Sequence, residues 1–355
     1  MNRTTRIISG DQAVIAAADL LRSGHVVGLP TETVYGLAAD ATNPEAVAKL
    51  FSVKGRPAHN PLITHVHTIA HARLISGDWP PAAVALAQAY WPGPLTIIVP
   101  SIGKVAPAVT ASHATIAIRI PAHPIMQQII TAVGRPLAAP SANRSGHISP
   151  TTAQHVFTDL AGLIELIVDG GDCDVGLEST VVGFPNGRAT IYRPGVITSE
   201  DIADTLLAAG IQSGPVPFAA TDGGGGPLLS PGMLERHYAP LRPAYHFDRS
   251  QVPQLTGIAF GHRGNLGLIT FGPLGIPAGH FSTVALATDL YQAARGLYAA
   301  MHSLDRPDID AIFIEMPTDE TALRHAATSG HPPIGMARVL ADRIRRASLP
   351  LPLKL

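Results

Sequence analysis

Apolar and polar residues alternate along this chain with two periods, one typical of helices and one typical of strands. Apolar residues recur at helical spacing over 11–23, 81–90 and 123–133, whereas β-branched runs occupy 95–99 and 115–120. Further helices are expected from Asn43–Pro44 to about 53, over 151–160 and from Thr198, and further strands at 25–29, 61–66, 137–139, 166–169, 179–182 and 190–192. This alternation predicts an α/β protein.

The pattern breaks over residues 209–240 and then resumes. Pro215, Pro217 and the glycine run 223–226 disfavour regular structure, so we interpret this stretch as a linker. Later strands are expected at 266–271, 284–287 and 309–314, and later helices at 291–301 and 334–346. The predicted organisation is a larger domain over 1–208, a Pro/Gly-rich linker over 209–240 that serves as a lid, and a smaller α/β domain over 241–355.

Composition agrees with a large buried core. The chain has 355 residues, of which 46% are hydrophobic and only 14% are charged, so two domains with well-covered sheets are expected. The net charge of −1 provides no global attraction to nucleic acid or membrane. The single cysteine, Cys173, excludes a disulfide within the chain and a cysteine-rich zinc site. We read no signal peptide and no membrane span, so a cytoplasmic location is expected.

Four cationic residues lie at the ends of predicted helices or strands, where they could bind a phosphate group. Lys54 and Arg56 follow the end of a predicted helix, where they are either solvated charges that complement the helix dipole or phosphate ligands. Arg119 and Arg193 each end an apolar strand, where a cation needs an anionic partner or a water-filled cleft. Convergence of all four on one pocket would suit a triphosphate.

Hydroxyl, amide and imidazole groups follow other predicted strands. Ser141 and Asn143 are either turn residues or ligand contacts, and Thr33 is either a strand former or a contact to a small polar substrate. His65, His67 and His71 are clustered, but no carboxylate has matching spacing, so a polar substrate contact by His65 is favoured over a metal site. The chain contains no Walker loop, no G-x-G-x-x-G after a strand and no G-x-S-x-G elbow.

Several segments together resemble one family. These are the stretch 30–37 (PTETVYGL), the K-x-R pair Lys54 and Arg56, the S-x-N pair Ser141 and Asn143, and the stretch 192–195 (YRPG). Their order and spacing resemble the YrdC-like family of L-threonylcarbamoyladenylate synthases. The stretches 230–233 (SPGM) and 237–240 (HYAP) resemble the longer, two-domain form of that family. The resemblance implies a YrdC-like twisted mixed sheet with flanking helices, followed by a Rossmann-like C-terminal domain.

The resemblance also implies site residues. The positions that match the family's catalytic pairs are Lys54, Arg56, Ser141 and Asn143. The positions that match ATP contacts are these four together with Asn60, Thr115, Ser149, Arg193 and the linker residue His237, which would fold back over the nucleotide. The positions that match L-threonine contacts are Thr33, His65, Arg119 and Ser179.

The implied reaction joins L-threonine, bicarbonate or CO₂, and ATP into L-threonylcarbamoyladenylate, with release of pyrophosphate. Mg²⁺ is expected to enter with ATP, held mainly through the phosphates, and no metal site of the protein's own is expected. The product would pass to the machinery that modifies adenosine in ANN-decoding tRNA, and direct tRNA binding is possible but not required. The alternatives are a non-catalytic module for double-stranded RNA, which the near-neutral charge disfavours, and a carbamoyl transferase of hydrogenase maturation, which the single cysteine disfavours.

Overall fold

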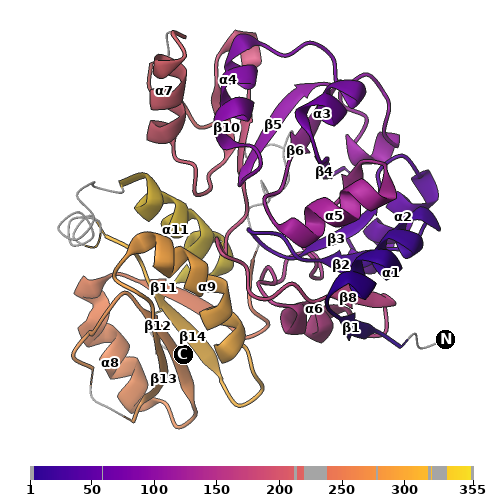
Figure 1. Cartoon of the computed structure of the whole chain (residues 1–355). Helices are drawn as coiled ribbons and strands as arrows, with labels where there is room; N and C mark the ends of the chain where they lie inside the picture. Colours follow the sequence, from indigo (N-terminus) through magenta and orange to yellow (C-terminus); the bar gives the residue numbers. More distant parts are fainter. Residues whose placement is uncertain are drawn as a thin grey trace. The chain divides into compact units, whose positions relative to one another are not determined.

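The chain forms two compact units, and Figure 1 shows the elements of each in a computed structural model. The structure describes residues 4–57, 59–211, 214–219, 238–276, 279–318, 321 and 334–352. The first unit comprises residues 1–145 and 149–234, and the second comprises residues 146–148 and 235–355. Within the described residues, no helix is both long enough and apolar enough to cross a membrane.

A ten-stranded mixed sheet forms the centre of the first unit. In spatial order its strands are β1 (Arg6–Ile8), β8 (Leu166–Val168), β2 (Val27–Leu29), β3 (Gly36–Asp40), β7 (Leu137–Ala138), β4 (Ile63–His65), β6 (Thr115–Arg119), β5 (Leu95–Pro100), β9 (Thr180–Gly183) and β10 (Thr190–Arg193). Neighbouring strands are antiparallel at five of the nine junctions, which include β2 with β3 and β5 with β6. This mixed sheet confirms the fold class that the resemblance implied.

Helices cover the two faces of this sheet unequally. The helices are α1 (Asp11–Arg22), α2 (Pro44–Lys54), α3 (Ile69–Ile75), α4 (Pro81–Tyr90), α5 (Pro124–Val133), α6 (Ala153–Leu160) and α7 (Ser199–Ala208). Helices α1 and α5 lie side by side (Figure 1) and pack on β2, β3, β7 and β8. On the opposite face, α2, α3, α4, α6 and α7 share one core with residues of β3, β5, β6 and β9. The face of β4, β6, β5 and β9 that points away from this larger core is therefore available for a site.

Local sequence signals set the ends of α2. Two of the predicted cations, Lys54 and Arg56, lie at its C-terminal end. The side chain of Asn43 accepts hydrogen bonds from the backbone N–H groups of Glu45 and Ala46, and Pro44 occupies the first helical position. The helix ends at Gly55, whose φ of 60° is left-handed and favours glycine. Lys54 and Arg56 are thus fixed on either side of this cap.

The second unit contains a smaller, fully parallel sheet. In spatial order its strands are β13 (Phe281–Ala285), β12 (Leu266–Thr270), β14 (Ala311–Glu315), β11 (Ala244–Phe247) and β15 (Leu349–Pro350). Helix α8 (Val252–Gly261) packs on one face through Leu255, Ile258 and Ala259. Helices α9 (Leu290–Leu304) and α11 (Ile334–Ala347) contact each other (Figure 1), and α9 faces β12 through Leu304, which lies against Gly267. This parallel sheet with its helices confirms the expected second α/β domain.

Some elements differ from the sequence-based expectation. Strands β1, β3, β11 and β15 and helices α3 and α8 were not predicted, and β13 begins three residues earlier than expected. Strand β3 has the sequence GLAAD, which lacks β-branched residues, and its pairing with β2 and β7 overrides that weak propensity. Most of the linker, including His237, lies outside the described residues.

Candidate active site

One face of four adjacent strands combines an apolar patch with polar side chains. The apolar patch consists of Ile63, Ile98, Ala117, Val181 and the partly buried Tyr192. Because alternate residues of a strand share a face, the residues two positions away from four of these lie on the same face: His65, Thr96, Arg119 and Ser179. We call this face the sheet floor. It brings together three of the four predicted threonine contacts.

Arg119 is the hub of one end of the sheet floor. Its side chain is 4% exposed, its Nε donates to the carbonyl oxygen of Gly93 at 3.1 Å, and its Nη1 donates to Thr33 Oγ1 at 2.8 Å. Its Nη2 lies 2.7 Å from Oε1 of Glu32. Arg119 and Thr33, both predicted as threonine contacts, are therefore in direct contact.

His65 lies beside Arg119, because the two residues are register partners on β4 and β6. Burial, and secondarily the Arg119 guanidinium, lower the pKa of His65 to about 3. Its Nδ1 is buried and has no hydrogen-bond partner among the described residues. His65 is therefore a neutral imidazole with a spare polar atom at the same end of the sheet floor.

Lys54 and the S-x-N pair form a second cluster. The Lys54 ammonium donates to the carbonyl oxygens of Ser141 and Asn143 and to Asn143 Oδ1, the last at 3.0 Å. Ser141 Oγ also donates to Asn143 Oδ1, at 2.6 Å. Burial, and secondarily the charge of Arg56, hold the pKa of Lys54 well below its usual range. Since a lysine ammonium has three donors, Lys54 uses all of them on this loop.

The loop of the S-x-N pair is tied to the stretch 30–37. Gly36 and Ser141 form an isolated β-bridge, and Ala142 N–H donates to the carbonyl oxygen of Tyr35 at 2.8 Å. Residues from three distant parts of the sequence therefore meet here: the end of α2, the loop before β3 and the loop after β7.

Arg56 and Asn60 make a short clamp between α2 and β4. Arg56 Nε donates to the Asn60 carbonyl oxygen at 3.2 Å, and its Nη2 donates to that of Pro61 at 2.9 Å. The Asn60 side chain is fully buried, and neither of its amide atoms has a partner within the described parts of the chain. A buried amide in this state is a ready contact for a polar ligand.

The remaining predicted contacts are Arg193, Ser179, Ser149 and Thr115. Arg193 Nε and Nη2 donate to the Ser179 carbonyl oxygen at 3.0 and 2.9 Å, and Ser179 Oγ lies 2.7 Å from Thr96 Oγ1. Ser149 Oγ donates to Glu178 Oε1 at 2.5 Å. Thr115 lies on β6 four residues before Arg119 and therefore on the same face. The four predicted cations are all buried, and the roles of these residues in binding stay predictions.

Glu32, Tyr35 and Cys173 also gather at this end. From the sequence, Tyr35 is either a strand former or a contact to a small polar substrate, Cys173 is expected to be structural, and Glu32 has no assigned role. The Tyr35 hydroxyl donates to the Gly171 carbonyl oxygen at 2.8 Å, and burial raises its pKa. Burial, with the Glu32 charge next, raises the pKa of the Cys173 thiol, so this thiol is neutral. The signal for Glu32 in the sequence was a carboxylate inside an otherwise uncharged stretch, Pro30 to Leu37.

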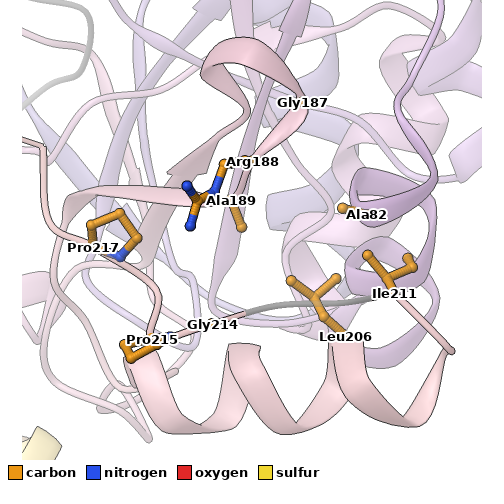
Figure 2. Close-up of a pocket in the computed structure, with 9 residues that line it drawn as sticks. All are labelled: Ala82, Gly187, Arg188, Ala189, Leu206, Ile211, Gly214, Pro215 and Pro217. Atoms are coloured by element: carbon orange, nitrogen blue, oxygen red, sulfur yellow. The ribbon is translucent and has the colours of Figure 1, made fainter.

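Two other features carry no site chemistry. Figure 2 shows a hollow beside α4 and α7 that none of the predicted site residues line. Its only charged lining residue is Arg188. His67 and His71 lie with their Nδ1 atoms 3.0 Å apart, bonded to each other. In the parts of the chain that the structure describes, no three His, Cys, Asp or Glu side chains are grouped to hold a metal ion.

Comparisons with known proteins agree with this architecture. The Sua5/YciO/YrdC family model, described as telomere recombination, matches residues 19–195, and the model of the threonylcarbamoyl-AMP synthase C-terminal domain matches residues 197–348. The threonylcarbamoyl-AMP synthase of Bacillus subtilis is 39% identical over 88% of this chain and 90% of its own length. That of Pyrococcus abyssi is 34% identical over 94% and 93%.

A solved structure is similar over the whole length. The crystal structure of P. abyssi Sua5 complexed with L-threonine covers 99% of both chains at 32% identity, with a TM-score of 0.84. Fold and sheet floor together define a two-domain transferase with a YrdC-like first domain. The chain belongs to the threonylcarbamoyl-AMP synthase family. This confirms the family to which the sequence motifs pointed, and it does not favour the RNA-binding alternative.

Proposed function

We propose that this chain synthesises L-threonylcarbamoyladenylate from L-threonine, bicarbonate or CO₂, and ATP, with release of pyrophosphate. The observation that carries the proposal is the sheet floor, on which one strand, β6, presents Arg119 at one end and Thr115 at the other. The Arg119 end suits an amino acid, and the Thr115 end suits a nucleotide beside the buried amide of Asn60. The relatives' names and the threonine-bound P. abyssi structure support this proposal.

The reaction proceeds in two displacements. The threonine amine attacks the carbon of CO₂, loses one proton and becomes a carbamate. A carbamate oxygen then attacks the α-phosphorus of ATP, the bond from this phosphorus to the bridging oxygen breaks, and pyrophosphate leaves. Such a transfer needs positioning and charge neutralisation more than covalent help from the protein.

The residues divide this work between them. Arg56 and Arg193 supply fixed positive charge beside the phosphates. Mg²⁺ held through the ATP phosphates would supply further positive charge there. Lys54 holds the S-x-N loop in place, so that Ser141 and Asn143 keep their orientation. The buried floor excludes water from the carbamate and from the labile product. The product then passes to a tRNA-modifying machinery in the cytoplasm.

The test is mass spectrometry of the products from ATP, L-threonine and ¹³C-bicarbonate. We expect a threonylcarbamoyl adenylate one mass unit heavier than with ordinary bicarbonate, and one pyrophosphate for each product molecule. Omitting L-threonine should abolish pyrophosphate release, and Arg56→Ala should slow it about 100-fold or more. Pyrophosphate release without threonine, or a product without the label, contradicts the proposal.

A further inference from the structure

The loop between β2 and β3 buries a carboxylate that the proposed function has so far left without a role. Glu32 is 7% exposed, and its backbone oxygen accepts a hydrogen bond from Val175 N–H at 2.8 Å. The loop is held rigidly, because Thr31 Oγ1 donates to the Val34 carbonyl oxygen at 2.7 Å. The Glu32 side chain is therefore placed by the fold and does not swing out to solvent.

The ion pair of Glu32 with Arg119 leaves both partners unsaturated. Oε1 lies 2.7 Å from Arg119 Nη2, but the two groups are not aligned for a hydrogen bond. Among the described residues, neither oxygen of Glu32 and not Nη2 of Arg119 has a hydrogen-bond partner, although all three atoms are buried. Leaving an ionised carboxylate without hydrogen bonds in the interior is costly, so these atoms point to a ligand that is both donor and acceptor.

Two neighbouring titratable groups, His65 and Cys173, add no charge to this pair. His65 is neutral because its pKa is lowered to about 3, and the Cys173 thiol is neutral because burial raises its pKa. One negative and one positive group therefore stand side by side at the threonine end of the sheet floor. A zwitterionic α-amino acid carries the complementary pair, a carboxylate for Arg119 and an ammonium for Glu32.

We propose that Glu32 is a catalytic residue that holds the α-ammonium of the amino-acid substrate and accepts its proton when the amine attacks CO₂. One N–H bond of the ammonium breaks, its proton moves to a Glu32 oxygen, and its electron pair becomes the nitrogen lone pair. That lone pair forms the N–C bond with CO₂ while one C=O electron pair moves to oxygen. The second N–H proton joins the hydroxide that bicarbonate releases on forming CO₂ and leaves as water, which gives the carbamate. This role rests on the proposed function, because it requires an amino-acid substrate at the Arg119 end.

The binding half of the proposal is tested by pairing one substitution with one change of ligand. Calorimetry measures the affinity of the full chain and of its Glu32→Gln variant for L-threonine and for (R)-3-hydroxybutanoate, which has the same carboxylate and hydroxyl but no amine. Glu32→Gln should weaken L-threonine binding about 10- to 100-fold, as expected for a charged hydrogen bond. Binding of 3-hydroxybutanoate should change less than about 3-fold.

Two results overturn the binding half. Equal weakening of both ligands means that Glu32 acts only by placing Arg119, and no weakening of threonine means that Glu32 does not touch the amine. If Glu32→Gln does not fold, the wild-type protein alone still decides, because equal affinity for the two ligands contradicts an ammonium site. Glu315→Gln, which alters a buried carboxylate paired with Arg249 in the second unit, is the matched control and should bind both ligands as wild type does.

The proton-transfer half is tested at saturating L-threonine. There the pyrophosphate-release rate of Glu32→Gln should remain at least about 100-fold below wild type. Recovery of the wild-type rate at saturation means that Glu32 is an anchor only, which overturns its catalytic role. If the wild-type protein itself forms no labelled product, the proposed function has failed, and that result is separate from any effect of Glu32.

Discussion

In two glutamate–arginine pairs, one in each unit, the buried carboxylates have their hydrogen bonds completed to opposite degrees. In the second unit, Glu315 is fully buried at the end of β14. Its Oε1 accepts from Arg249 Nε at 2.6 Å, and its Oε2 accepts from Phe271 N–H at 2.5 Å. In the first unit, neither oxygen of Glu32 has a hydrogen-bond partner among the described residues.

The difference separates two uses of a buried charge. The oxygens of Glu315 are satisfied by the protein itself, so this carboxylate ties the end of β14 to the end of β12 and to the residues after β11. Glu32 keeps its capacity for bonding at the place where a substrate is expected. Completion of the hydrogen bonds, more than burial or charge, therefore distinguishes a group that holds the fold from a group that binds a ligand.

Removing the arginine of each pair should give the largest difference between the two pairs. Arg119→Ala leaves Glu32 buried without a cation, so we expect about 3–5 kcal/mol less stability and loss of threonine-dependent pyrophosphate release. Arg249→Ala should cost less, because Glu315 keeps the Phe271 N–H, and product formation should persist. Urea unfolding with a pyrophosphate assay measures both. Equal losses of activity in the two variants contradict the distinction.

Lys54 extends the comparison to a charged group in the candidate site whose hydrogen bonds are all made within the protein. Because its three donors hold the S-x-N loop, Lys54→Met should cost about 2–4 kcal/mol and speed amide exchange at Ala142 and Ser145. Lys49→Met is the matched control, since among the described residues Lys49 on the same helix donates only to the Gly24 carbonyl oxygen, at 2.8 Å. Unchanged exchange at the loop in Lys54→Met shows that this lysine does not position it.

His65 tests the comparison through the pH dependence of stability. Its buried imidazole is neutral, and its Nδ1 has no hydrogen-bond partner among the described residues. Its pKa is about 3 in the folded chain and about 6.5 when unfolded, so the unfolded chain binds the extra proton below pH 6.5. The stability that it contributes is present above pH 6.5 and is lost as the pH falls toward 3. Between pH 7 and 5 the wild type should lose about 2 kcal/mol more than His65→Asn, measured by urea unfolding. Parallel pH curves contradict the neutral imidazole.

The smallest expected effect is the loss of the N-cap hydrogen bonds of α2, which belong to neither pair. Asn43→Ala removes the N-cap of α2 and should cost about 1 kcal/mol, with pyrophosphate release near the wild-type rate. Asn43→Asp keeps a capping oxygen and should remain close to wild type in thermal unfolding. A larger activity loss than stability loss would mean that the start of α2 also shapes the site at its end.

The local signals of this sequence predicted much of the fold. The helix that begins after Asn43, the helix that begins after Thr198 and the β-branched run of β6 each appear where the sequence placed them. Strand β3 was missed because pairing with its neighbours, and not its own residues, makes it a strand. Sequence periodicity carries no information on such long-range partners.

The site was predictable in its members but not in their contacts. The positions of Arg119 and Thr33 followed from the family resemblance, whereas their hydrogen bond joins residues 86 positions apart. Glu32 was passed over between two threonines, since a single sequence does not show that its carboxylate reaches β6. Likewise, the position of Lys54 beside Arg56 suggested a phosphate ligand, which stays a prediction, whereas its hydrogen bond to a loop 89 positions away was not visible in the sequence.

Strand β6 has a consequence for which molecules can react. Under the proposed function, Thr115 lies at the nucleotide end of one extended strand and Arg119 at its amino-acid end, four residues and therefore about 13 Å apart. A loop could change this spacing, but a strand that is hydrogen-bonded on both sides keeps it fixed. The proposed function therefore implies that the backbone itself limits the distance between the phosphorus and the amino acid's carboxylate, before any side chain discriminates between substrates.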